Sequence, residues 1–321
     1  MVPTPPLRLQ PTFKYRIWGG RRFDTRFHYD GVPDGPVGEC WGISAHPNGP
    51  SRVIDGPHAG RTLPEVWELD RAFFGDDPRP EFPLLVKFLD AERWLSVQVH
   101  PDDAEAAELE GAPLGKAECW FVVDAEPGAE LIIGHTAATK GELAAMIDEG
   151  RWDDFLLRQP VVPGDFVNVP SGTVHSVGPG LLVCEVQQSC DTTYRVYDFD
   201  RLDTDGNPRE LHLDKAKRVL TAPYDPATTD TAGPLVHVEG GRRQELVTTG
   251  PFAVTRHEVD GDGYTVTFPG YELCTVTGGS GKLGYGGEAW PLGAGDHLIL
   301  PAGAGEVTLS GTLTVISSHP L

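Results

Sequence analysis

The chain has few cysteines, and they are not arranged for cross-linking or for metal binding. Of its 321 residues only five are cysteine, an odd number that includes no CxxC pair. Neither a disulfide framework nor a cysteine zinc site is therefore indicated. We expect reduced thiols, packed mostly within strands. The cysteines are Cys40, Cys119, Cys184, Cys190 and Cys274.

Basic residues and long apolar runs are also scarce. The 26 Lys and Arg stand against 47 Asp and Glu, for a formal net charge of −21. This charge repels nucleic acids and anionic membranes, so neither is expected as a partner. No apolar run approaches the length of a membrane span, and the first residues, MVPTPPLR, lack the apolar core of a signal peptide. We expect a cytoplasmic protein.

Glycine and proline, in contrast, are abundant, and the clearest motif contains both. The 39 Gly and 29 Pro suit a mostly β protein of many short strands and turns. Residues 164–175, GDFVNVPSGTVH, have the form of a strand between two tight turns, with His175 just beyond the second. A histidine in this place can point into a small barrel. The spacing is that of the second signature motif of cupins, in which this histidine is a metal ligand.

A second polar pattern lies upstream, in LSVQVHPDD at residues 95–103. Strict alternation puts Ser96, Gln98 and His100 on one face of a strand and apolar residues on the other. Burial of such a polar face is unfavourable without a partner, and a metal ion supplies one. We therefore expect this strand to contribute ligands to the same site as His175.

The third element is GKAECW at residues 115–120, where Glu118 begins an apolar strand and Lys116 lies on the same face. One amide oxygen, two imidazoles and one carboxylate make an N2O2 set that suits zinc, with manganese, iron or cobalt chemically possible. Taken singly, His175 or Glu118 is more often an ordinary residue of a turn or a strand end. Their combination with the polar strand favours a metal site.

Two further charged residues fall within apolar strands. Lys87 interrupts residues 82–90, and its ammonium group is costly to bury unless it meets an anion, either a substrate phosphate or an internal carboxylate. Glu39, within residues 38–44, could be a metal ligand by chemistry alone. We interpret it as a hydrogen-bonded strand carboxylate, because the set of four ligands is complete without it.

Five segments, read in order, resemble type I mannose-6-phosphate isomerase in its short bacterial form. The resemblance implies a double cupin fold and one zinc ion held by a Gln, two His and a Glu. These ligands fall on Gln98, His100, Glu118 and His175, and the family's catalytic arginine falls on Arg195. The segments are residues 82–90, 95–103, 115–120, 169–175 and 187–198.

The implied reaction is the reversible aldose-ketose isomerisation of mannose 6-phosphate and fructose 6-phosphate through an enediol. Zinc is a Lewis acid without redox chemistry, which suits this reaction, and no dinucleotide-binding glycine motif accompanies the barrel. Lys116, Asp191 and Glu185 are candidates for acid-base roles, and Arg195 for stabilising enediolate charge. Asp191 and Arg195 follow in a polar, Thr-rich segment, for which we expect a loop over the site.

The expected partner is a small sugar phosphate, and its pocket must be locally basic against an acidic background. Lys87, Lys116 and Arg195 are placed to make it so, and we assign substrate binding to Lys87 and Ser96. Two other functions stay open. A metal-dependent cupin oxygenase would use the basic groups to bind a carboxylate, and a regulatory protein would bind a sugar phosphate without turnover. We expect a monomer or a weak dimer.

The last third of the chain repeats the motif without its ligands. Residues 295–306 copy the spacing of residues 164–175, but Glu306 stands where the ligand histidine was, and no Gln-x-His precedes it. His297 is a lone imidazole, which we interpret as hydrogen-bonded or exposed. We therefore expect a metal-binding catalytic cupin domain at 1–235 and a cupin-like domain without metal ligands at 236–321.

Short helical insertions are expected between the strands. Thr62 with Glu65 forms a capping-box pattern, and Asp102 or Asp103 can cap a helix that follows the polar strand. The expected helices begin near residues 62 and 102, occupy two segments on either side of Gly150 within residues 139–158, and occupy residues 211–220.

Overall fold

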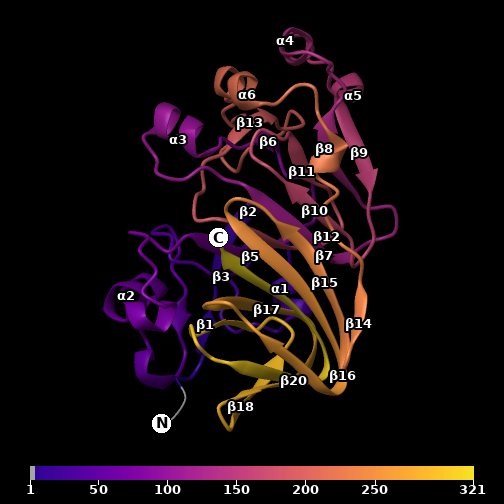
Figure 1. Ribbon diagram of the computed structural model, residues 1–321. Coiled ribbons are helices and arrows are strands. Elements are labelled where there is room, and N and C mark those ends of the chain that lie inside the picture. The colour runs from indigo at the N-terminus through magenta and orange to yellow at the C-terminus, as the bar shows by residue number, and fades with distance from the viewer. Residues whose placement is uncertain (1–3) are drawn as a thin grey trace.

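The computed structural model describes residues 4–321, and the strands of this part of the chain form three antiparallel sheets (Figure 1). The first three residues of the N-terminal segment considered above lie outside the described range. The mostly β prediction is confirmed. No helix within residues 4–321 combines the length and the apolar character needed to cross a membrane.

The largest sheet is built mainly from the last third of the chain. Two strands from the N-terminal part complete one of its ends, so segments distant in sequence share this sheet. In spatial order the strands are β14 (Val236–Val238), β15 (Gly241–Thr248), β16 (Phe252–Thr267), β20 (Glu306–Pro320), β17 (Glu272–Tyr285), β19 (His297–Leu300), β1 (Leu7–Gln10) and β4 (Arg52–Val53), and β18 (Glu288–Gly293) pairs with β17.

The other two sheets come from the first two thirds of the chain and face each other. The six-stranded sheet has the order β10 (Phe166–Val169), β7 (Glu118–Ala125), β12 (Leu181–Gln188), β5 (Leu84–Ala91), β2 (Thr12–Gly20) and β3 (Val37–Ile43). The five-stranded sheet has the order β13 (Tyr194–Tyr197), β6 (Val97–Val99), β11 (His175–Val177), β8 (Glu130–His135) and β9 (Leu156–Pro160).

Short helices fill the connections, as predicted. The expected caps are present: the Thr62 backbone N–H donates to Glu65 Oε2 at 2.7 Å, and the Glu105 N–H donates to Asp102 Oδ1 at 2.8 Å. The α-helices are α1 (Arg22–Thr25), α2 (Leu63–Leu69), α3 (Asp103–Glu110), α4 (Lys140–Asp148), α5 (Trp152–Phe155) and α6 (Leu213–Val219). The 3₁₀ turns are η1 (Gly56–His58), η2 (Arg71–Phe74) and η3 (Pro226–Thr228).

Alternation along the six-stranded sheet divides its side chains between two apolar cores. Phe88 and its neighbours on one face pack against residues of the nine-stranded sheet such as Leu273. Trp120 and Val183 on the opposite face pack against Leu131 and others of the five-stranded sheet. Because it packs against one of the other sheets on each face, the six-stranded sheet is the central layer of the molecule. Full burial of a large apolar side chain in either core stabilises the folded state by about 1.5–3 kcal/mol.

Helices cover the outer face of the five-stranded sheet. In Figure 1 α4, α5 and α6 lie together at the end of the molecule that this sheet occupies. Leu143 of α4, Phe155 of α5 and Val219 of α6 pack against Val97 and Ile132 of the sheet. The inner face of the five-stranded sheet is thus directed at the central layer. The polar residues on that face point toward the six-stranded sheet and away from the helices.

The C-terminal part encloses a core of its own. Its long strands change register at bulges, between Gly261 and Tyr264 in β16 and between Val276 and Gly278 in β17. Tyr264, Val276 and Leu309 belong to the apolar core that these strands surround. The last third of the chain therefore has an apolar core of its own within the nine-stranded sheet. The division at residue 235 stays a prediction, and β1 pairs with β19 across it.

Candidate functional site

Three polar residues lie side by side on the inner face of the five-stranded sheet. Gln98 on β6 pairs with His175 on β11 and with Arg195 on β13. The predicted alternation is confirmed, because Val97 and Val99 belong to the core under the helices. Arg195 lies on a strand, so the prediction of a loop there is wrong. The Thr-rich composition suggested a loop, but pairing with β6 keeps the backbone extended.

His100, Glu118 and His175 come together between the two facing sheets, all of them buried. Nε2 of His100 lies 3.5 Å from Glu118 Oε2, and Nε2 of His175 lies 3.3 Å from Glu118 Oε1. One donor atom from each of the three residues lies within 4.8 Å of the others. Three candidate ligands from three segments of the chain therefore converge on one point, and their role as metal ligands stays a prediction.

The two imidazoles are oriented by carbonyl groups that accept from Nδ1. His100 Nδ1 lies 2.8 Å from the Thr192 oxygen, and His175 Nδ1 lies 2.9 Å from the Thr173 oxygen. Since a carbonyl only accepts, each Nδ1 holds a proton and each Nε2 presents a lone pair to the centre. Burial, followed by the charge of Lys116, lowers the pKa of His175 to about 3, and the same two causes lower the pKa of His100. Both rings are therefore neutral at neutral pH.

Glu118 gives the test of whether the cluster fits a cation. Its side chain is fully buried, and neither carboxylate oxygen accepts a hydrogen bond from residues 4–321. Lys116 Nζ lies 2.8 Å from Oε2 as an ion pair without hydrogen-bond geometry, and also 3.0 Å from His100 Nε2. A buried carboxylate beside two neutral imidazole lone pairs is the donor set of a divalent metal site. The residues fit a divalent metal ion.

Gln98, the fourth predicted ligand, borders this cluster. Its Nε2 lies 3.3 Å from His175 Nε2, and Ser96 Oγ lies 3.5 Å from its Oε1. A half-turn of the amide would exchange the nitrogen for the oxygen and present Oε1 to the centre. Ligation by Gln98 stays a prediction.

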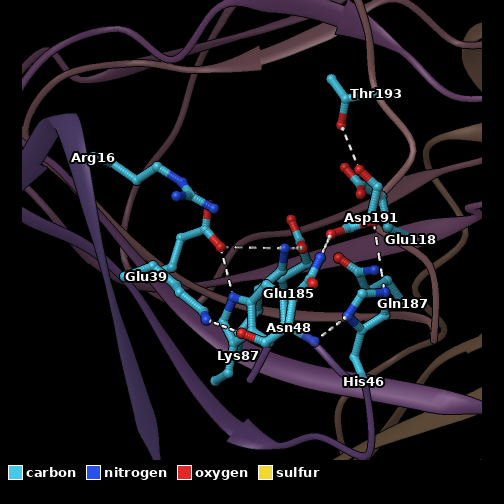
Figure 2. A network of polar contacts seen from close by, with 12 residues as sticks. Arg16, Glu39, His46, Asn48, Lys87, Glu118, Glu185, Gln187, Asp191 and Thr193 are labelled. Carbon is cyan, nitrogen blue, oxygen red and sulfur yellow. Dashed lines mark hydrogen bonds and ion pairs between the residues drawn. The ribbon is translucent and has the colours of Figure 1, made fainter. Parts of the chain in front are cut away.

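Lys87 meets internal carboxylates, the second of the two partners considered for it. Its Nζ lies 2.8 Å from Glu185 Oε1 and 3.9 Å from Glu39 Oε2 (Figure 2). On β5 and β12 the two residues Lys87 and Glu185 are directly paired. Trp120 Nε1 donates to the other oxygen of Glu185 at 2.9 Å. The ammonium charge of Lys87 is thus balanced from within the protein.

The interpretation of Glu39 as a hydrogen-bonded strand carboxylate is confirmed. Arg16 Nε donates to its Oε1 at 2.7 Å, and Trp41 Nε1 donates to its Oε2 at 2.6 Å. Burial alone would raise the pKa of Glu39, but Lys87 and Arg16 outweigh burial and lower the pKa to about 2. Glu39 therefore stays charged and helps to balance Lys87.

A cavity of about 320 Å³ opens next to the cluster. This volume lies at the lower end of the range of about 300–1,000 Å³ that is usual for small-molecule sites. A larger hollow of about 830 Å³ lies on the nine-stranded sheet, among Arg242, Glu258 and several glycines. The smaller cavity is the one beside the cluster, because its lining residues Gln98 and Lys116 lie next to His175 and His100. Its charged lining residues are Arg16, Glu39, Lys87, Lys116, Glu185, Asp191, Arg195 and Arg209, with Ser96 and Gln98 among the neutral ones.

Asp191 lies at the cavity's rim, where it also lines an adjoining hollow. Its carboxylate accepts from Asn48 Nδ2 at 2.6 Å and lies 3.6 Å from His46 Nε2 (Figure 2). About half of the side chain is exposed. Asp191 is thus the solvent-accessible carboxylate of the cavity, in contrast to the buried Glu185.

Two lining residues of the cavity, Arg16 and Arg209, were missed by sequence reasoning. Arg16 lies on β2, and alternation along that strand would have identified only a face, not a site. Arg209 follows β13 in an irregular segment without a motif. Arg16 is held by Glu39 of β3 and Arg209 by Asp198, and neither pairing is marked by a sequence motif.

The second half shows no counterpart of this cluster within the described residues. His297 is buried, and its ring nitrogens lie 2.9 Å from Thr275 Oγ1 and 3.1 Å from the Tyr29 hydroxyl oxygen. Glu306 is exposed at the start of β20. Within residues 4–321, the only group of three or more potential His, Cys, Asp or Glu ligands is His100, Glu118 and His175. The prediction that His297 is hydrogen-bonded is confirmed.

Comparisons with known proteins identify two family models that match separate parts of the chain. Residues 7–133 match the catalytic domain of type I phosphomannose isomerase, and residues 243–320 match the cupin domain of mannose-6-phosphate isomerase. The mannose-6-phosphate isomerase ManA of Bacillus subtilis is 44% identical over 321 residues, 98% of this chain and 99% of that protein. The mannose-6-phosphate isomerase of Streptococcus mutans is 46% identical over 314 residues, 98% of each chain.

Solved structures give the same result. The crystal structure of mannose 6-phosphate isomerase from Bacillus subtilis superposes with a TM-score of 0.93 at 45% identity, covering 98% of this chain and 99% of that one. A mutant of phosphomannose isomerase from Salmonella typhimurium reaches a TM-score of 0.78 at 15% identity, over 98% and 99% of the two chains, which shows a shared fold. The relatives from Bacillus subtilis and Streptococcus mutans cover 98% of this chain. The chain belongs to the type I phosphomannose isomerase family.

Proposed function

We propose that this protein is a metal-dependent isomerase that interconverts mannose 6-phosphate and fructose 6-phosphate. The observation that carries the proposal is the buried cluster of His100, Glu118 and His175 beside a cavity lined by cations. Neither carboxylate oxygen of Glu118 accepts a hydrogen bond from the described residues, as expected for a carboxylate that binds a metal ion. Full-length relatives at 44–46% identity are mannose-6-phosphate isomerases.

Gln98, His100, Glu118 and His175 would hold the metal ion, with zinc as the proposed metal. A bound zinc ion would supply Lewis-acid polarisation of the substrate's C1 and C2 oxygens without redox chemistry. The two imidazoles are held neutral with Nε2 inward, which is the form that binds a metal. The remaining steps of the reaction fall to groups on the cavity wall.

The isomerisation moves protons and leaves the oxidation state of the molecule as a whole unchanged. A base takes the proton from C2 of the aldose, and the electron pair of that C–H bond forms the C1–C2 double bond. The electrons of the C1 carbonyl bond move to O1, which takes up a proton to give the enediol. Return of a proton to C1, with loss of the O2 proton, yields the ketose. Lys116, Glu185 and Asp191 line the cavity and are the proposed acid-base groups. Substitution of each of these three residues tests which of them removes the C2 proton and which donates a proton to C1.

Arg195 is proposed to stabilise the negative charge of the enediolate. The residue is the strand neighbour of Gln98, so it enters the cavity beside the metal ligands. Preorganised positive charge at a developing oxyanion lowers the barrier without reorganisation. Ser96 and Lys87 are proposed to bind the sugar, and Lys87 would do so through hydrogen bonds to its oxygens, because its charge is already balanced.

A coupled assay with fructose 6-phosphate, combined with metal analysis, tests the proposal. We expect turnover that is lost on chelation and restored by zinc. Iron with oxygen consumption and no isomerisation would instead support a cupin oxygenase. Tight sugar-phosphate binding without turnover would support a regulatory protein. Exchange of the C2 hydrogen with solvent, measured in each of three variants, would separate the proton-transfer roles. The variants are Lys116→Met, Glu185→Gln and Asp191→Asn.

A further inference from the structure

The cations that line the cavity differ in how far their charges are balanced. Arg195 has no carboxylate within ion-pair distance in residues 4–321, and its buried Nε has no hydrogen-bond partner there. The only hydrogen bond that its guanidinium makes with this part of the chain runs from Nη1 to the Glu210 carbonyl oxygen, at 2.7 Å. The other cations have close carboxylates: Arg16 with Glu39, Lys87 with Glu185, Lys116 with Glu118 and Arg209 with Asp198.

The carboxylate beside Arg209 is shared. Asp198 accepts hydrogen bonds from Nε of Arg209 at 2.7 Å and from Nη2 of Arg209 at 2.5 Å. It also accepts one from Nη2 of Arg201 at 2.5 Å. Burial would raise the pKa of Asp198, but the hydrogen bonds from Arg209 and Arg201 outweigh burial and lower the pKa. One buried carboxylate thus serves two guanidinium groups. With Arg195 included, three guanidinium groups lie near this one carboxylate, and two of them, Arg195 and Arg209, line the cavity.

Asp198 also fixes the orientation of Arg209. The carboxylate occupies the Nε and Nη2 edge of the planar guanidinium, which leaves Nη1 without a hydrogen-bond partner in the described chain. Arg209 lines the cavity that Arg195 lines, whereas Arg201 does not line it. The charge of Arg209 contributes, after burial, to the lowered pKa of Arg195. The two guanidinium groups therefore lie close enough to repel each other, and a bound anion would relieve that repulsion.

The cavity wall combines a metal-ligand candidate with guanidinium groups, and a sugar phosphate needs both. Gln98 borders the metal-ligand cluster, and Arg195 follows it on the neighbouring strand. Arg209 then adds a second guanidinium on the cavity wall. A sugar phosphate has its reacting carbonyl at one end and a dianion at the other. With the carbonyl at the metal ligands, the dianion needs positive charge that no internal carboxylate balances. Lys87 does not offer this charge, because Glu185 and Glu39 balance it.

We propose that Arg209 is a phosphate-binding residue of this cavity: its guanidinium, held by Asp198, binds the substrate phosphate on the side of Arg195 away from the metal-ligand candidates. The proposal rests on the isomerase function proposed above and adds a residue that determines specificity for the phosphorylated sugar. Arg209 is a binding residue and takes no part in proton transfer.

The test compares Arg209→Gln with Arg201→Gln, a matched control that removes the other guanidinium on Asp198 but no cavity-lining group. We expect Arg209→Gln to raise KM for fructose 6-phosphate about ten-fold or more, as for a lost charge-assisted hydrogen bond, with kcat little changed. The inhibition constant of inorganic phosphate should rise by a similar factor. Arg201→Gln should alter neither value. Arg209→Lys should recover part of the affinity, because it keeps the charge and loses the planar geometry.

Two results would overturn the proposal. Equal effects of Arg209→Gln and Arg201→Gln would show that Arg209 acts only by holding Asp198. An unchanged KM and inhibition constant in Arg209→Gln would show that the phosphate binds elsewhere. If the wild-type protein has no isomerase activity, the proposed function fails, but calorimetric titration with inorganic phosphate still decides the role of Arg209. Binding to the wild type that Arg209→Gln weakens would support the site, and equal binding would refute it.

Discussion

The ion pair between Lys87 and Glu185 allows the sharpest test of how the cavity wall is built. The two side chains are 8% and 3% exposed, and Nζ lies 2.8 Å from Oε1. Removing one partner of a buried pair leaves the other charge without compensation, which typically costs about 3–5 kcal/mol. We therefore expect Lys87→Met to lower the free energy of unfolding by about 3–5 kcal/mol, measured by urea denaturation.

A double variant separates a lost pair from a generally damaged core. Lys87→Met combined with Glu185→Leu leaves neither charge buried alone, and replacing such a pair by apolar residues is often neutral. Glu39 retains its hydrogen bond from Arg16 in this variant. We expect the double variant to recover most of the stability that Lys87→Met loses. A loss below about 1 kcal/mol in the single variant, or no recovery in the double variant, would refute this reasoning.

Kinetics of the single variant address the second role considered for Lys87. If its charge is balanced internally, Lys87→Met should change kcat/KM for fructose 6-phosphate and for unphosphorylated fructose by the same factor. A selective loss for the phosphorylated sugar would instead assign the phosphate to Lys87. In Arg209→Gln, by contrast, we expect the ratio of kcat/KM for fructose 6-phosphate to kcat/KM for fructose to fall. The two variants therefore form a matched pair.

Four further outcomes are expected. His100→Ala should lose both the bound metal and activity, because it removes one of the ligands; full metal occupancy with activity would contradict the site. Arg195→Ala should keep the metal and the fold but lower kcat about 100-fold, the effect of a lost oxyanion-stabilising group, and loss of zinc would count against that role. Glu306→Ala should leave turnover and a content of one zinc per chain unchanged, as measured by metal analysis, and a second tightly bound metal lost with it would contradict a silent C-terminal half. A hydrogen bond to Glu272 raises the pKa of His319 above 6.5. The stabilisation from this contact is therefore complete below pH 6.5 and is lost as the pH rises through the folded-state pKa. The difference in unfolding free energy between wild type and His319→Gln should shrink over the same rise in pH.

Local pattern was sufficient to predict the metal-ligand candidates. The side-chain period of two in a strand separates Gln98 and His100 from the apolar residues between them, and this separation holds whichever strand lies next to them. His175 follows a turn whose Pro and Gly mark its position in the sequence. Glu118 begins a strand that is otherwise apolar. Each signal is contained within a few residues, so none required knowledge of the sheet order.

The charge balance of the cavity, in contrast, depends on pairings between distant segments. The sequence left Lys87 with two alternatives, and the register of β5 against β12, which sets it opposite Glu185, decides between them. Arg195 was expected in a loop because its own segment is polar, whereas its pairing with Gln98 is a property of two strands.

The position of Arg209 depends on Asp198, a carboxylate that the sequence does not distinguish from the other acidic residues. Opposite charges are common throughout this acidic chain, and only the fold shows which of them are left unbalanced. The reacting end of the cavity can therefore be predicted from sequence motifs. The end proposed to bind the phosphate follows only from the excess of cations that remains after the ion pairs are assigned.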